Sequence, residues 1–167
     1  TAAPSGVTVN GDAALDINNI ASTITDVASG KTLTLSSTGG TPALTVTKTT
    51  GTLKMATASV PLTVNGDATV DIANLATSIA DVASAKTLTL TNSGDGSAGD
   101  VTITKAGTIA GTVATVAAAK TFAKVSIGAS TVLTALTVGA GSTITVLENK
   151  LAGSVITTLT VNGSIGA

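Results

Sequence analysis

One set of oxygen-bearing side chains occurs twice in the chain, 55 residues apart. Each copy reads NGD, followed by a second Asp four residues after the first and an Asn three residues after that. Carboxylate and amide oxygens are the ligands that Ca²⁺ prefers. The pattern therefore predicts two equivalent calcium sites, and the alternative is an Asn-Gly-Asp turn followed by an aspartate at a helix N-cap. The two sets are Asn10, Asp12, Asp16 and Asn19, and Asn65, Asp67, Asp71 and Asn74.

A second acidic stretch, DGSAGD, lies outside the repeated design. Its two carboxylates, Asp95 and Asp100, flank a glycine-containing segment and could also hold a cation. The alternative is a solvated hairpin loop. Calcium is thus the one cofactor that the sequence suggests, with Asp12, Asp16, Asp67, Asp71, Asp95 and Asp100 as its candidate ligands.

Side chains that usually carry catalysis are scarce. The chain has no His and no Cys, which removes the commonest general base and the thiolate nucleophile. Ser84 and Lys86 are close in sequence, but a Ser–Lys pair needs a lysine buried in a pocket, and this spacing also fits an ordinary strand. Nine acidic residues could supply a glycosidase pair, but Arg is absent and Phe122 is the only aromatic residue to bind a sugar. We therefore expect no enzymatic activity.

The composition also excludes classes of partner. A net charge of −1 without a basic cluster leaves little to neutralise a nucleic-acid backbone, and a single aromatic residue provides no stacking platform. Polar residues interrupt every apolar run well before the ~18 residues of a transmembrane helix. The expected partners therefore include neither nucleic acid nor a membrane span.

Alternation of apolar residues with Thr dominates the chain. TLTL at 32–35, TLTLT at 87–91 and TLTV at 158–161 each place Leu or Val on one face and Thr on the other. This period of two predicts half-buried strands, and Gly-, Asn- and Ser-rich turns such as NGD at 10–12 separate them. The fold class is expected to be mainly β.

One segment in each repeat carries a different spacing. Ile17, Ile20, Ile24 and Val27 are three, four and three residues apart, which is also the spacing of a helical stripe. Asp16 would then be the N-cap and Gly30 the residue after the helix. The many Thr, Ser and β-branched residues argue instead for short strands joined by tight corners. Both alternatives stay open, so a short helix in each repeat is one expectation.

The repeats suggest three modules. Residues 1–61 and 62–116 form the first two, and residues 117–167 form a divergent third. The last residues, LTVNGSIGA, restart the motif LTVNGDATV of the second module, so we expect an incomplete repeat with an open strand edge at this end. Two architectures fit: a stacked β-solenoid, which we favour, and two tandem β-sandwich-like modules of about 55 residues.

Two recurrent patterns remain. Lys31 follows Asp26 by five residues, and Lys86 follows Asp81 by the same distance. In a helix this spacing would place each lysine near the C-terminus, where a cation is favoured; the alternative is that these residues form salt bridges between subunits. Thr-x-Thr motifs could order water as ice-binding solenoids do, but their starts are unevenly spaced in the sequence, which argues against one regular face.

Motifs such as VASGKTLTL, LTVGAGSTITV and LTVNG resemble the Thr-, Ala- and Gly-rich repeats of bacterial or archaeal surface-layer proteins and large secreted adhesins. The resemblance is compositional. It implies an extracellular, self-assembling, β-rich protein, often calcium-dependent, although the Gly-Gly-x-Gly-x-Asp calcium motif of many such proteins is absent.

These observations predict an extracellular structural protein that forms a filament or surface layer through strand edges and small-residue faces. Its partners would be other copies of itself, and Asn162-Gly-Ser164 offers a sequon for a glycan. The alternative function is a calcium-stiffened spacer or binding module of a large cell-surface adhesin.

Overall fold

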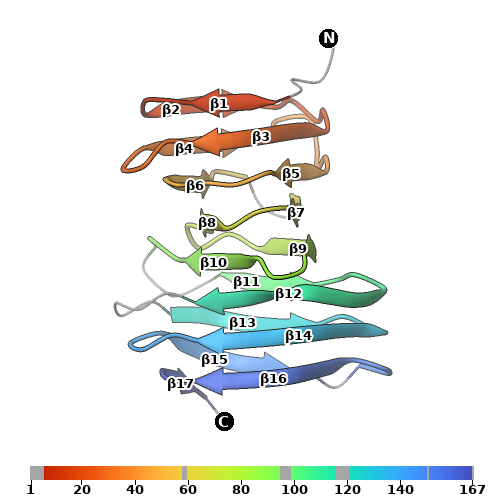
Figure 1. The fold of residues 1–167 in the computed structure, drawn as a ribbon. Helices are drawn as coiled ribbons and strands as arrows, with labels where there is room; N and C mark the ends of the chain where they lie inside the picture. The colour runs from red at the N-terminus through yellow and green to blue at the C-terminus, as the bar shows by residue number, and fades with distance from the viewer. Residues whose placement is uncertain (1–5, 58–59, 95–98, 116–120, 150, 167) are drawn as a thin grey trace.

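The strands wind into a β-solenoid whose coils stack along one axis (Figure 1). The computed structural model describes residues 6–57, 60–94, 99–115, 121–149 and 151–166. Every regular element in these ranges is a β-strand, and each coil contributes one strand to each of two sheets. The predicted solenoid is confirmed. The tandem-sandwich alternative is wrong because the strands pair in parallel across the whole length, whereas hairpin-built sandwiches pair antiparallel.

The two sheets take alternate strands of the chain. Sheet A contains β1 (Val7–Val9), β3 (Ser22–Val27), β5 (Leu44–Val46), β7 (Pro61–Val64), β9 (Thr77–Val82), β11 (Asp100–Ile103), β13 (Thr121–Ile127), β15 (Thr143–Glu148) and β17 (Ser164–Ile165). Sheet B contains β2 (Ala13–Asp16), β4 (Thr32–Ser36), β6 (Thr52–Met55), β8 (Ala68–Asp71), β10 (Thr87–Thr91), β12 (Gly107–Thr115), β14 (Thr131–Val138) and β16 (Val155–Val161).

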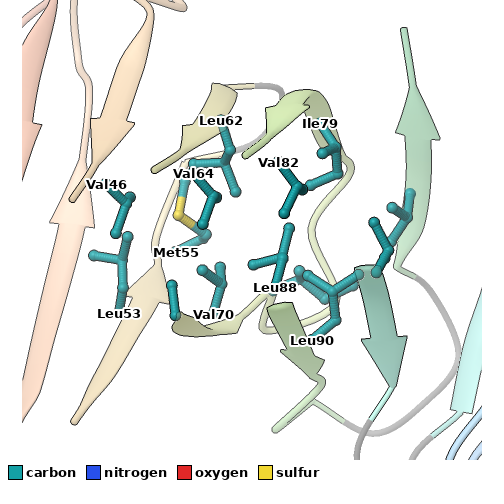
Figure 2. Packing of buried hydrophobic residues seen from close by; sticks show 14 of the residues in the cluster. Val46, Leu53, Met55, Leu62, Val64, Val70, Ile79, Val82, Leu88 and Leu90 are labelled. Atoms are coloured by element: carbon teal, nitrogen blue, oxygen red, sulfur yellow. The ribbon is translucent and has the colours of Figure 1, made fainter. Parts of the chain in front are cut away.

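The core is a set of apolar ladders between the two sheets. Figure 2 shows Leu62 and Val64 of sheet A facing Met55 and Val70 of sheet B across it. Because side chains alternate along a strand, the Val, Ile and Leu of each period-two run point inward and the Thr point outward. Parallel pairing in register then stacks like on like, as where Leu88 lies beside Val113 and Val113 beside Leu136.

The helix expected in each repeat is wrong. The segment with the three-four-three spacing follows β2 directly and forms a corner and then β3. Asn18 and Asn19 turn this corner with φ of 44° and 61°, a left-handed conformation that Asn adopts more easily than most residues. Ile17 before the corner and Ile24 after it are both buried, so an interrupted strand pair satisfies the same apolar spacing.

The 55-residue period corresponds to three coils. β1 to β4 are followed three coils later by β7 to β10, whose sequences match them. β5 pairs with β7 and β6 with β8, so the modules 1–61 and 62–116 share both sheets. The expected boundary at 116/117 lies outside the described residues.

Among the described residues, no helix is long and apolar enough to cross a membrane.

Candidate functional site

The two repeated carboxylates of the first set lie far apart. Asp12 precedes β2 and Asp16 ends it, so an extended strand separates them by about 13 Å at ~3.3 Å per residue. Asp67 and Asp71 bracket β8 in the same way. The structure therefore does not bring the two aspartates of either set together, since close spacing in sequence becomes distance once the backbone is extended.

Each of these aspartates instead accepts a hydrogen bond from a backbone N–H group of the following coil. Asp12 Oδ1 accepts a hydrogen bond from the N–H of Thr32 at 2.8 Å, and Asp67 Oδ1 accepts one from Thr87 at 2.9 Å. Asp16 Oδ1 accepts from Thr38 at 3.1 Å. These carboxylates tie neighbouring coils together, and a helix N-cap is not their role.

The corner aspartate Asp16 is a strongly bonded anion on the surface. Its Oδ1 also accepts the N–H of Asn18 at 2.9 Å, and its Oδ2 accepts the hydroxyl of Thr38 at 2.8 Å. The N–H of Asn18, with the hydroxyl and N–H of Thr38, lowers the pKa of Asp16 below its ordinary value. Asp71, the equivalent residue, is only 5% exposed.

The second acidic stretch adds little to a metal site. Asp95 lies outside the described residues, and Asp100 begins β11 beside Lys124 of β13. In the part of the chain that the structure describes, no group of three or more acidic side chains is arranged to hold a metal ion. Calcium binding therefore stays a prediction from the sequence.

Two aspartates of sheet A form ion pairs with lysines of the next coil. Asp26 lies 3.5 Å from Nζ of Lys48, and Asp81 lies 2.7 Å from Nζ of Lys105. Lys31 and Lys86, which follow these aspartates five residues later, are not their partners within the chain. A coil is a little over 20 residues long here, so spacings of 22 and 24 residues, rather than five, were the signal for these pairs.

Threonines line up on the outer face of sheet B. Thr32 lies beside Thr52, Thr69 beside Thr89 and Thr137 beside Thr160, and Ala114 is the one substitution in this rank. Of the Thr-x-Thr motifs, those at 32–34 and 87–89 contribute to this rank, whereas those at 45–47, 102–104 and 143–145 lie in or beside strands of sheet A. The rank members are Thr32, Thr52, Thr69, Thr89, Ala114, Thr137 and Thr160.

The last coil leaves core positions open to solvent. Leu159 and Val161 continue the ladders of Leu136 and Val138, which are buried. The side chains of Leu159 and Val161 are nevertheless 45% exposed, because no further coil covers β16 among the described residues. β16 and β17 are also edge strands, whose outer backbone groups are free to pair with another strand.

The first coil is open in a matching way. β1 and β2 are the edge strands at this end, and a hollow of about 350 Å³ lies between them. Val7, Val9 and Leu15 line it. The sequence predicted that neither end is capped, with an open strand edge at the C-terminal end; the N-terminal hollow itself follows from the two-sheet arrangement.

Comparison of the chain with protein-family models, with curated proteins and with solved structures gives no match. The open ends, the coil-binding aspartates and the threonine rank are therefore the features from which a function is argued.

Proposed function

We propose that this chain is an extracellular structural protein that assembles with copies of itself into a filament or layer. The observation that supports this proposal is the pair of open ends. Each end presents one edge strand in each sheet, paired on one side only, and at the C-terminal end Leu159 and Val161 occupy core positions that are exposed. Stacking another copy would pair the strands and bury these side chains.

The uniform character of the body also supports a structural role. Three coils recur as one 55-residue unit, and cross-coil hydrogen bonds from the repeated aspartates recur with them. A contact between unlike ends of identical subunits does not close on itself and makes a linear polymer. The extracellular location rests on the compositional resemblance to surface-layer and adhesin repeats.

Electron microscopy at rising protein concentration, with calcium and with a chelator, tests the assembly. Ordered filaments or sheets are expected in both conditions. The variant Leu159→Asp should abolish them, because it places a charge on the open core edge. The control Thr134→Asp adds the same charge on an exposed residue of β14, a strand that is paired on both sides and not at the open edge, and should leave them intact.

Isolated compact particles under every condition would contradict the proposal. Monomers whose rigidity depends on calcium would instead support the adhesin-spacer alternative.

The threonine rank favours a second candidate function, the ordering of surface water. Its hydroxyls repeat at the strand spacing of about 4.8 Å on the outer face of sheet B, although Lys54 and Asp71 lie in the neighbouring rank. Thermal hysteresis of ice growth measures this activity. Thr89→Lys, within the rank, should reduce the thermal hysteresis. Thr63→Lys, on the outer face of sheet A, should leave the thermal hysteresis unchanged. A wild-type protein without hysteresis would rule it out.

A further inference from the structure

The corners that lead from sheet A to sheet B differ in length in the middle of the stack. Residues 47–51 join β5 to β6, residues 65–67 join β7 to β8, and residues 83–86 join β9 to β10. The shortest corner therefore lies between two longer ones, and a hollow of about 420 Å³ is lined by residues of all three. Described coils lie on both sides of these corners, so the hollow belongs to the body of the solenoid.

Contacts between coils hold the floor of the hollow in place. The N–H of Thr49 donates to the carbonyl oxygen of Asp67 at 3.0 Å, and the hydroxyl of Thr49 accepts the N–H of Thr69 at 2.7 Å. Gly66 is buried, and a Cβ there would overlap the carbonyl oxygen of Thr47, so the short corner packs directly against the corner before it. These contacts form the hollow before any ligand binds, which lowers the cost of binding.

Two lysines line the hollow, one from the coil before the short corner and one from the coil after it. Lys86 forms no ion pair with any described residue. Lys48 lies 3.5 Å from Asp26, but its side chain is 56% exposed, so this pair is weak and leaves the ammonium available to a ligand. Asp67 supplies the one carboxylate of the lining. Two ammonium groups against one carboxylate favour a ligand with an anionic group.

The short corner itself lines the hollow with groups that bind hydroxyls. Asp67 Oδ1 accepts the N–H of Thr87 at 2.9 Å, and among the described residues no donor is bound to its Oδ2. The side-chain amide of Asn65, an exposed residue, can both donate and accept hydrogen bonds. The lining thus offers donors for an anion and acceptors for hydroxyls within one hollow.

We propose that this hollow binds a hydroxylated carboxylate of the kind found in sugar acids. The ligand carboxylate accepts hydrogen bonds from Lys48 and Lys86, and the ligand hydroxyls bond with Asp67 and Asn65. The volume of about 420 Å³ lies within the ~300–1,000 Å³ of small-molecule pockets and exceeds what an inorganic anion fills. No aromatic side chain lines the hollow, so charge rather than stacking selects the ligand. This inference goes beyond the proposed assembly and does not depend on it.

NMR titration of the whole chain with glucuronate tests the site. The backbone amide signals of Thr49, Gly66 and Lys86 should shift together and saturate. Lys86→Gln should weaken binding at least about tenfold, because a charge-assisted hydrogen bond is lost. The control Lys54→Gln removes the same charge from the outer face of sheet B, outside the lining, and should leave the affinity unchanged. Both variants should keep the wild-type unfolding midpoint, since neither lysine forms an ion pair with a described residue.

Related probes define the chemistry of the ligand. Methyl glucoside carries the hydroxyls without the charge, and acetate carries the charge without the hydroxyls. Each should bind at least about tenfold more weakly than glucuronate, because each lacks one set of hydrogen bonds. A polyuronate that binds more tightly than glucuronate would identify a polysaccharide as the source of the ligand. Equal affinity per sugar residue would identify a free sugar acid.

Three outcomes would overturn the inference. Glucuronate without saturable shifts at these amides would remove the site, whether or not the chain forms filaments. Equal weakening by Lys86→Gln and Lys54→Gln would show that the anion binds the surface without using the hollow. Acetate that binds as tightly as glucuronate would rule out a hydroxylated ligand.

Discussion

The carboxylate of Asp71 accepts a hydrogen bond from the backbone N–H of Ser93, one coil further along the stack, at 2.8 Å. The same oxygen accepts the N–H of Ala73 at 3.0 Å within its own corner. Asp16 makes the equivalent pair of bonds with Asn18 and Thr38. The repeated aspartate thus closes its own corner and fastens that corner to the next coil.

Removing this carboxylate should destabilise the stack. Asp71→Ala leaves the N–H groups of Ala73 and Ser93 without their acceptor, at a cost of about 1–3 kcal/mol. Asp71→Asn keeps an amide oxygen as acceptor and should cost less. Chemical unfolding followed by circular dichroism measures both. Equal losses for the two variants would show that charge, rather than hydrogen bonding, is what the site requires.

Asp16 should make the stability depend on pH in the acid range. Its pKa is lowered in the folded chain by the N–H of Asn18 and by Thr38, so the carboxylate stabilises the fold above the ordinary value of 3.8. That contribution is lost as the pH falls below 3.8 through the folded pKa. An NMR titration of the Asp16 carboxyl should therefore give a midpoint below 3.8.

The matching control for the pH dependence is Asp16→Asn, which does not titrate. Thermal midpoints of the wild type and this variant should converge as the pH falls towards 2. A wild-type carboxyl that titrates at or above its ordinary pKa would contradict the expectation.

Two glycines of the same motif should respond differently to the same substitution. Gly66→Ala forces a Cβ against the carbonyl of Thr47 and should cost about 1–3 kcal/mol of unfolding free energy. Gly11→Ala has open space and should change the monomer by less than about 0.5 kcal/mol. Unfolding of dilute, monomeric protein measures the difference. A harmless Gly66→Ala would mean that the corner relaxes.

The ion pair of Asp81 with Lys105 should show a small coupling. Both side chains are about one-third exposed, so a double-mutant cycle should give about 0.2–1 kcal/mol, reduced by salt. The same cycle on Asp81 and Lys86 is the control and should give none. Coupling to Lys86 instead of Lys105 would contradict the observed pairing.

The local spacing of apolar residues predicted the strands correctly but not the corners between them. Alternation of Leu with Thr at 32–35 and 87–91 identified β4 and β10, because a half-buried strand needs that period. The spacing of Ile17, Ile20 and Ile24 fitted a helix equally well, since it describes which residues are buried and not the path between them. The left-handed backbone conformation of Asn18 and Asn19 shows that the path is a corner between two strands and not a helix.

The candidate site depended on contacts between coils, which sequence spacing does not display. Asp12 and Asp16 are four residues apart, yet β2 holds them at opposite ends. Asp26 and Lys48 are 22 residues apart, yet they lie 3.5 Å from each other. In a solenoid, neighbours in space are one coil away in sequence, so the coil length must be known before partners can be named.

By itself, the sequence determined the repeat, the β character and the two faces of each strand, because these follow from composition and a period of two. Only the tertiary structure decided which residues meet. Stacking in register brings outward-facing threonines from different runs of sheet B into one rank, and the extended strands separate the paired aspartates.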